Sequence, residues 1–288
     1  MFRSKREAFA FIHTQRQALA LTRLCALYGV TRAGYYAWAC RRPSVHAEQD
    51  RKLLHHVERV FRAHGGRYGS PRVMRALRAE GIVVGRRRVM RLMHRAGLRA
   101  RAARIYRANP RLHQFFTQHP NRIRRLAVRH PNRVWVGDIT YIPVAGQWRF
   151  LAVVMDQYSR RILAWTLAGR RSTQLTRAVF NAAIRRRGVG ARLVFHSDRG
   201  SEYSGSVFRD RLRALGVQQS AALRGPGENA HMESFFHSLK AELLHATTFT
   251  TDAALRRALS GYFQFYNRCR LHSALGYRTP IDYEAIAA

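Results

Sequence analysis

Three consecutive segments that begin at Arg133 limit the possible folds of this chain more than any other feature. They are rich in β-branched and aromatic residues and are separated by turn signals, which predicts three strands in a meander. The segments are RVWVGDITYIPVA, QWRFLAVVMDQYS and RRILAWTLAG, at residues 133–145, 147–159 and 160–169.

Further along the chain, predicted helices alternate with predicted strands. The helices are expected at 172–187, 206–215, 228–245 and 252–267, and the strands at 192–198 and 217–221. A strand meander followed by such alternation is typical of an α/β domain rather than of a barrel or a bundle. We therefore predict an α/β domain over residues 131–288.

The first 100 residues predict helices only. Residues 14–40 read as two short helices, and Ser44 after Pro43 is typical of the start of a third. Within 64–97, Ser70 and Pro71 fit the N-cap and first residue of another helix, with Gly81 as its stop. Residues 101–130, with scattered arginines and two X-Pro turns, predict a basic linker.

The segment from Arg86 to Ala96 predicts an amphipathic helix. Val89, Met90, Leu92 and Met93 are expected to face the interior. Two helices around a tight turn fit a helix-turn-helix whose second member reaches DNA, and the alternative is a solvated arginine face on an ordinary helix pair. The arginines predicted to contact DNA are Arg86, Arg87, Arg88 and Arg91.

The charge of the chain favours a polyanionic partner. Fifty-two Lys and Arg against 16 Asp and Glu give a net charge of +36, and all but three of the basic residues are arginines. Such a charge repels itself in a compact fold unless a polyanion neutralises it, and the planar guanidinium suits phosphate oxygens. A GC-rich genome would explain Arg over Lys but not the shortage of acids. Residues 1–130 carry +25 of the total, which indicates the stronger grip on nucleic acid.

Other classes of protein find little support. The three cysteines have no CxxC spacing and the 14 histidines complete no zinc pattern with them, so neither a structural zinc nor a disulfide framework is expected. No apolar run reaches about 18 residues, and the N-terminal segment lacks the apolar core of a signal peptide. We expect a cytoplasmic protein that does not associate with membranes.

Three acids stand out in the second half of the chain. Asp138 lies in the first predicted strand, Asp198 ends the strand LVFHSD, and Glu233 lies on a predicted helix together with Asn229 and Lys240. Carboxyl ends of strands are where α/β sheets usually place ligands. Clustered carboxylates repel each other unless a cation is present, and oxygen ligands suit Mg²⁺. By contrast, we assign turn, cap or surface roles to Asp156, Glu202, Asp210, Glu242 and Asp252.

Four motifs in order resemble one family. They are W-x-x-D-I-T-Y, H-S-D-R-G-S-E-Y, N-A-x-x-E-S-F-F-x-x-L-K and Y-N-R-x-R-x-H-x-x-L-G-Y-x-T-P, at residues 135–141, 196–203, 229–240 and 266–280. Asp198 and Glu233 are 35 positions apart in the sequence. The chain is similar to the OrfB-type transposases of bacterial insertion sequences of the IS-three type, within the DDE superfamily that includes retroviral integrases.

This resemblance implies a fold and a reaction. It implies a ribonuclease-H-like core preceded by a helical DNA-binding region over residues 1–100, in which 64–97 is the clearest helix-turn-helix. It further implies cleavage of the element's ends and transfer of a strand with a 3′-hydroxyl to target DNA. Two Mg²⁺ or Mn²⁺ ions would be held by Asp138, Asp198 and Glu233, and Asp138 would bridge both ions. Asn229 and Lys240 would contact DNA, and His196 would either orient the strand or pack beneath the strand end.

The resemblance also implies partners. They are double-stranded DNA, as element end and as target, an OrfA-type protein or a frameshift fusion, and further copies of the chain on DNA near the nucleoid. Three alternatives remain open at this point: a non-catalytic DNA-binding protein, a ribonuclease-H-like nuclease or resolvase without strand transfer, and a tyrosine or serine recombinase. The last needs a nucleophilic hydroxyl, and none of the 12 tyrosines stands in an R-H-R-Y setting.

Overall fold

A five-stranded mixed sheet forms the centre of the second half of the chain. The computed structural model describes residues 2, 4–41, 44–101, 121–123, 126–190, 192–222 and 229–286. The strand order is β3-β2-β1-β4-β5. The first three strands pair antiparallel, whereas β4 pairs parallel with β1 and with β5. The strands are β1 (Val134–Val144), β2 (Gln147–Asp156), β3 (Ile162–Ala168), β4 (Val194–Ser197) and β5 (Gln218–Ala221).

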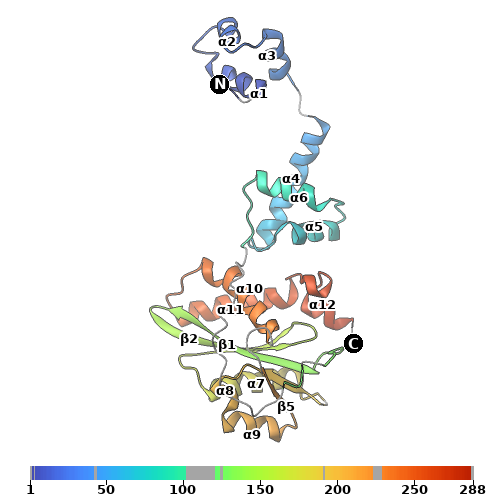
Figure 1. Ribbon diagram of the computed structural model, residues 1–288, viewed down its shortest axis with the longest axis vertical. Helices are drawn as coiled ribbons and strands as arrows, with labels where there is room; N and C mark the ends of the chain where they lie inside the picture. Colours follow the sequence, from blue (N-terminus) through green and yellow to red (C-terminus); the bar gives the residue numbers. More distant parts are fainter. Residues whose placement is uncertain are drawn as a thin grey trace.

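Helices cover both faces of this sheet (Figure 1). Along β1, Val134 and Val136 contribute to the core beneath α10 (Ala230–Glu242) and α11 (Asp252–Arg268), whereas Trp135 contributes to the core on the opposite face. That opposite core contains residues of α7 (Thr173–Arg187), α8 (Ser201–Ser204) and α9 (Ser206–Ala214). The alternation of side chains along a strand explains why successive residues of β1 serve two cores. The predicted meander and the alternation of helices and strands are confirmed.

Six helices precede the sheet, in two groups. The first group, α1 (Lys5–Gln15), α2 (Leu21–Leu27) and α3 (Arg32–Ala39), encloses a small core of its own around Ile12 and Tyr35. The second comprises α4 (Val45–Ala63), α5 (Ser70–Ala79) and α6 (Arg86–Arg95) around Val57, Val73 and Leu77. Ser44 caps α4 as predicted, because its hydroxyl accepts a hydrogen bond from the backbone N–H of Ala47.

Three details of the helical predictions are wrong. Helix α1 begins after Ser4, ahead of the predicted start of helical structure at residue 14. Gly69 is the N-cap of α5, so Ser70 is already the first helical residue. Met90, which was predicted to face the interior, is 52% exposed. Val89, Leu92 and Met93 form the buried face of α6, and the side chain of Met90 lies outside that face. Most of the predicted linker 101–130 lies outside the described residues.

The α4–α6 group contacts the segment that follows α11. The Tyr68 hydroxyl donates a hydrogen bond to the Cys269 carbonyl oxygen at 2.6 Å, and Arg72 Nε donates to the Leu271 carbonyl oxygen at 2.9 Å. Phe265 and Leu271 pack against the core of α4–α6.

In the part of the chain that the structure describes, no helix combines the length and the apolar character needed to cross a bilayer.

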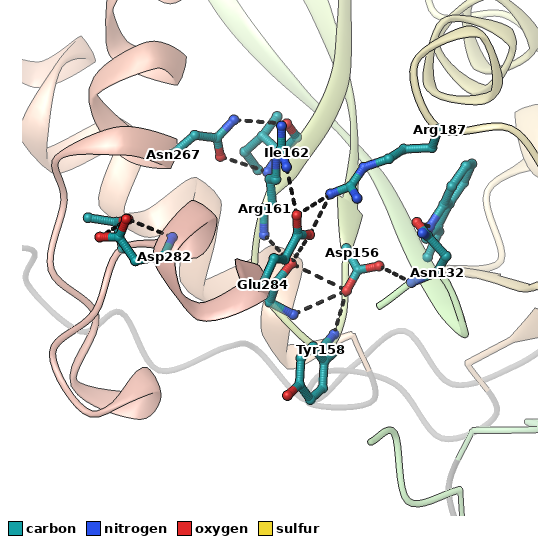
Figure 2. Close-up of polar contacts among 12 residues, drawn as sticks. Asn132, Asp156, Tyr158, Arg161, Ile162, Arg187, Asn267, Asp282 and Glu284 are labelled. Carbon is teal, nitrogen blue, oxygen red and sulfur yellow. Dashed lines mark hydrogen bonds and ion pairs between the residues drawn. The ribbon is translucent and has the colours of Figure 1, made fainter. Parts of the chain in front are cut away.

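The last helix, α12 (Pro280–Ala285), is held to the sheet by a buried carboxylate (Figure 2). Glu284 pairs with Arg161 at 2.6 Å and with Arg187 of α7, and it accepts a hydrogen bond from the Ser159 hydroxyl at 2.7 Å. Asp156 accepts backbone N–H bonds from the turn that follows β2 and from Asn132. The predicted turn role of Asp156 is therefore confirmed.

Candidate active site

The register of two parallel strands brings Asp138 and Asp198 together. Gly137 of β1 lies opposite Ser197, the last residue of β4. The residues that follow them, Asp138 and Asp198, therefore lie next to each other where the pairing of β1 with β4 ends. Neighbouring strands are about 4.8 Å apart. Both carboxylates are half-buried.

Two glycines make room for this arrangement. A Cβ on Gly137 would lie 2.5 Å from the Phe195 ring, which packs against β1 from β4. A Cβ on Gly200 would collide with the carboxylate of Glu202 and with Arg171, which lie beside Asp198. The packed Phe195 ring would have to move for a side chain at Gly137, whereas the ends of the flexible Glu202 and Arg171 side chains could shift more easily for one at Gly200.

Helix α10 brings the third acid to the same edge. Asn229, the N-cap of α10, is buried, and its Nδ2 donates a hydrogen bond to the Gly137 carbonyl oxygen at 3.2 Å, one residue before Asp138. Glu233 follows Asn229 by one helical turn, about 6 Å along the axis. Glu233 is exposed, unlike the two aspartates.

The pKa of Asp138 is influenced by both of the other acids. Burial, then the negative charge of Asp198, raises the pKa of Asp138 to about 8, and Glu233 adds to this effect. Burial also raises the pKa of Asp198, partly offset by the Gly200 N–H bond and by the charge of Arg171. A carboxyl with a raised pKa loses its proton more readily when a cation is near.

The oxygen donors of this edge suit a magnesium ion, but they do not form a closed cage. Among the described residues, no three Asp, Glu, His or Cys side chains are gathered closely enough to hold a metal ion. Mg²⁺ usually keeps several waters and takes only one or two carboxylates together with phosphate oxygens of its substrate. An open group of carboxylates is compatible with that coordination.

Four side chains outside the predicted site were not predicted to have a role, or were given a different one. Arg171 Nε donates to Glu202 at 2.7 Å, and Arg171 lowers the pKa of both aspartates. Glu202 is therefore a buried ion-pair partner rather than a surface charge, and Glu242, which pairs with Arg270, is another. Tyr203 is fully buried, and among the described residues its hydroxyl has no hydrogen-bond partner. The motif H-S-D-R-G-S-E-Y contained the signal for Glu202 and Tyr203.

The remaining residues predicted for the site differ in placement. His196 is buried, and its Nδ1 lies 2.9 Å from the Ser220 hydroxyl, so it packs beneath the strand end rather than facing DNA. Lys240 is half-buried, with Nζ 5.5 Å from the centre of the exposed Tyr141 ring. Asn229 is buried between α10 and β1, so its amide nitrogen positions the helix and does not face solvent.

The predicted DNA-contacting arginines lie on α6, away from the acids. Arg86 and Arg87 are exposed. Arg88 and Arg91 instead form salt bridges with the two oxygens of Asp50, at 2.7 and 2.6 Å. Hydrogen bonding from Arg88 and the charges of both arginines lower the pKa of Asp50 despite its burial. The two pairs share one carboxylate, so the net charge here remains positive.

Family models match three parts of the chain. An integrase core domain matches residues 128–225, a second integrase core domain model matches residues 216–280, and an HTH-like domain matches residues 48–106. The last range covers α5, α6 and all but the first three residues of α4. Together these matches span the sheet, its helices and the helical group that docks on α11.

Curated relatives match over nearly their whole length. A transposase for the insertion sequence element IS904 of Lactococcus lactis is 36% identical over 247 residues, which are 85% of this chain and 98% of the relative. The transposase InsF for the insertion sequence IS3A of Escherichia coli is 31% identical over 283 residues, which are 96% of this chain and 98% of that protein.

Solved structures are more distant. The catalytic core domain of HTLV-2 integrase in complex with magnesium is 17% identical with a TM-score of 0.44, and covers 54% of this chain and 97% of its own. The simian T-cell lymphotropic virus intasome gives 20% identity and a TM-score of 0.49, covering 73% of this chain and 70% of its own. From the domain matches and the curated relatives, we conclude that the chain belongs to the DDE-type transposases of IS3-type insertion sequences, with a ribonuclease-H-like integrase catalytic core.

Proposed function

We propose that Asp138, Asp198 and Glu233 hold two divalent metal ions, Mg²⁺ or Mn²⁺, and that this centre cuts the ends of the element and joins them to target DNA. When bound, the ions would stabilise the charge on the attacking and leaving oxygens of the phosphodiester. The chain's own part is to hold three carboxylates at one sheet edge and to keep α10 fixed against β1. Family membership favours this function over the three alternatives considered from the sequence.

One observation supports the assignment most strongly. The β1–β4 register makes Asp138 and Asp198 neighbours, and the hydrogen bond from Asn229 to the Gly137 carbonyl joins the helix that carries Glu233 to the same strand, which supports a shared site for the three acids. Their mutual repulsion is costly in the absence of a cation, since the charges of Asp198 and Glu233 both raise the pKa of Asp138. Acids that raise each other's pKa lower the stability of the fold, and such groups are typical of functional sites.

We also propose the division of labour between the two halves of the chain. Residues 1–100 would form the DNA-binding region, 101–130 a linker and 131–288 the catalytic core. The exposed Arg86 and Arg87 at the start of α6 support contact with the DNA backbone or bases. An OrfA-type partner or fusion and a homo-oligomer on DNA near the nucleoid remain predictions from the resemblance.

The test is a cleavage and joining assay with purified full-length chain, Mg²⁺ and DNA that carries the inverted repeats flanking the gene. Asp138→Ala and Glu233→Ala should abolish cleavage while DNA affinity is unchanged. Asp210→Ala is the matched control, because Asp210 is an exposed acid on α9 that pairs only with Arg213 among the residues described. Cleavage by either active-site variant would refute the assignment, and cleavage without joining by the wild type would favour a nuclease.

A further inference from the structure

A recess between α10 and the segment after α11 lies apart from the three acids. It has a volume of about 370 Å³, many times the roughly 30 Å³ that one water molecule occupies. Its walls come from α5, from the turn between β2 and β3, from α10 and from the segment after α11. The polar and charged residues that line it include Arg72, Arg160, Ser234, Ser238, Arg270 and His272.

The recess carries excess positive charge. Arg270 is neutralised by Glu242 behind it, in a buried ion pair at 2.7 Å. Among the described residues, none that line the recess is acidic, and Arg72 and Arg160 form no ion pair, although the charge of Glu242 also acts on Arg72, whose Nε donates to the Leu271 carbonyl oxygen. Burial, together with the charge of Arg270, lowers the pKa of Arg72, and burial lowers that of Arg160. Bringing guanidinium groups together in a half-closed recess is unfavourable unless an anion is bound.

Polar atoms in the walls lack partners. Within the described part of the chain, Arg160 Nε and His272 Nε2 are buried without a hydrogen-bond partner, and the His272 side chain is more than nine-tenths buried. Burial and the neighbouring arginine charges lower the pKa of His272 to about 3, so the ring is neutral. Its Nδ1 lies 3.4 Å from Arg270 Nη1.

The recess and the acid cluster share helix α10. His231, Ser234 and Ser238 line the recess at spacings of three and four residues, which is one face of the helix. Ser234 directly follows Glu233 and is rotated from it by about 100° around the axis, with a rise of about 1.5 Å. A DNA strand bound at Glu233 would therefore need to extend only around one side of α10 to contact the recess.

We propose that this recess binds a phosphodiester group of the DNA that lies over α10, and so holds the substrate beside Glu233. Unpaired guanidinium and N–H donors around a small polar recess match the acceptor oxygens of a phosphate. The inference rests on the proposed function only in taking DNA as the ligand. It gives a role to Arg270 and His272 of the motif at 266–280, which the acid cluster does not use.

The test measures the affinity of the full-length chain for a short DNA duplex over about 0.05 to 0.5 M NaCl, with EDTA present. Arg160→Gln removes one donor group, and Ser273→Glu places a carboxylate at the exposed rim. Loss of one phosphate contact should lower the log-log salt slope by about 0.9, which corresponds to about eightfold weaker binding at 0.1 M salt. Both variants should unfold at the wild-type temperature, since within the described part of the chain neither side chain takes part in an ion pair.

Matched controls carry the same changes elsewhere. Arg213→Gln and Ser206→Glu alter charge equally on α9, which packs on the opposite face of the sheet, and Ser206, like Ser273, is the first residue of a helical turn. The controls should shift affinity less than twofold. If the recess variants match their controls, the proposal is wrong.

A second arm separates DNA from free phosphate. If inorganic phosphate, compared with chloride at equal ionic strength, raises the unfolding temperature of the wild type but Ser273→Glu binds DNA like its control, the recess takes free phosphate and the DNA assignment is wrong. Because EDTA prevents metal chemistry, the binding result is independent of the cleavage assay. A chain that shows the predicted salt slopes but never cuts DNA would refute the proposed function and leave the phosphate pocket intact.

Discussion

Replacing Asp138 by Asn should stabilise the metal-free protein. The carboxyl is half-buried beside Asp198, and these two effects raise its pKa from 3.8 to about 8. The amide of Asn carries no charge, yet its oxygen still accepts the Ile139 backbone N–H bond, which is 2.8 Å long at Asp138. The variant therefore removes the cost of keeping the carboxyl protonated in the folded state and keeps the local hydrogen bond.

The size of the effect follows from proton linkage. A carboxyl whose pKa is raised by folding contributes most to stability below its unfolded pKa, and that contribution is lost as the pH rises through the folded pKa. At pH 7 the cost is at most about 4 kcal/mol, or 1.36 kcal/mol for each pH unit above 3.8. For a domain of roughly 150–250 residues, in which 1 kcal/mol shifts Tm by about 2–4 °C, that predicts a rise in Tm of up to about 8–16 °C for Asp138→Asn.

Thermal unfolding in EDTA at several pH values tests the argument. The stabilisation should be largest at about pH 8 and should disappear below about pH 3, where the wild-type carboxyl is protonated in both states. Asp210→Asn is the control, because Asp210 is exposed on α9 and should show no such pH dependence. An Asp138→Asn variant that melts at or below the wild-type temperature at pH 7 would refute the reasoning.

Three further perturbations have definite expected outcomes. Glu284→Gln leaves Arg187 and Arg161 without their buried carboxylate and should lower the free energy of unfolding by about 3 kcal/mol. The Tm should fall accordingly, and an unchanged Tm would contradict the buried ion pairs. Tyr203→Phe removes a buried hydroxyl without a described partner, so denaturant unfolding should show equal or greater stability, whereas a loss above about 1 kcal/mol would reveal a hydrogen bond. Asp50→Asn frees two arginines of α6 and should raise DNA affinity at low salt in an anisotropy titration; weaker binding would mean that Asp50 orients them for DNA.

The sheet could be predicted because its sequence signals are local. The three strands of the meander carry β-branched and aromatic residues between clear turns, and β1, β2 and β3 begin within a few residues of the predicted segments. Helix α1 had a signal that was overlooked: Ser4 and Glu7 have the spacing of a capping box, and the Ser4 hydroxyl accepts the Glu7 N–H bond. Helix α12 begins at a Thr-Pro pair in the same way.

The site could be predicted only in part, because long-range pairing decides which residues meet. Asp138 and Asp198 were identified as strand residues, but only the parallel register of β1 with β4 makes them neighbours. Burial reversed other expectations: Asn229 faces β1 instead of solvent, and Glu242 lies inside, paired with Arg270 from 28 residues later. A single sequence does not specify such partners, since an acid in a helix has the same local pattern whether it is exposed or paired.

The central claim is that Asp138 and Asp198 contact the metal ions directly, and exchange of the ligand atom tests it most sharply. Asp198→Cys replaces a hard carboxylate by a thiolate, which binds Mg²⁺ poorly and softer ions better. With purified protein and DNA carrying the element's ends, we predict that Asp198→Cys is inactive in Mg²⁺ and regains cleavage in Mn²⁺, whereas Asp198→Ala is inactive in both. Equal activity of Asp198→Cys in the two metals, or cleavage by Asp198→Ala, would contradict the account.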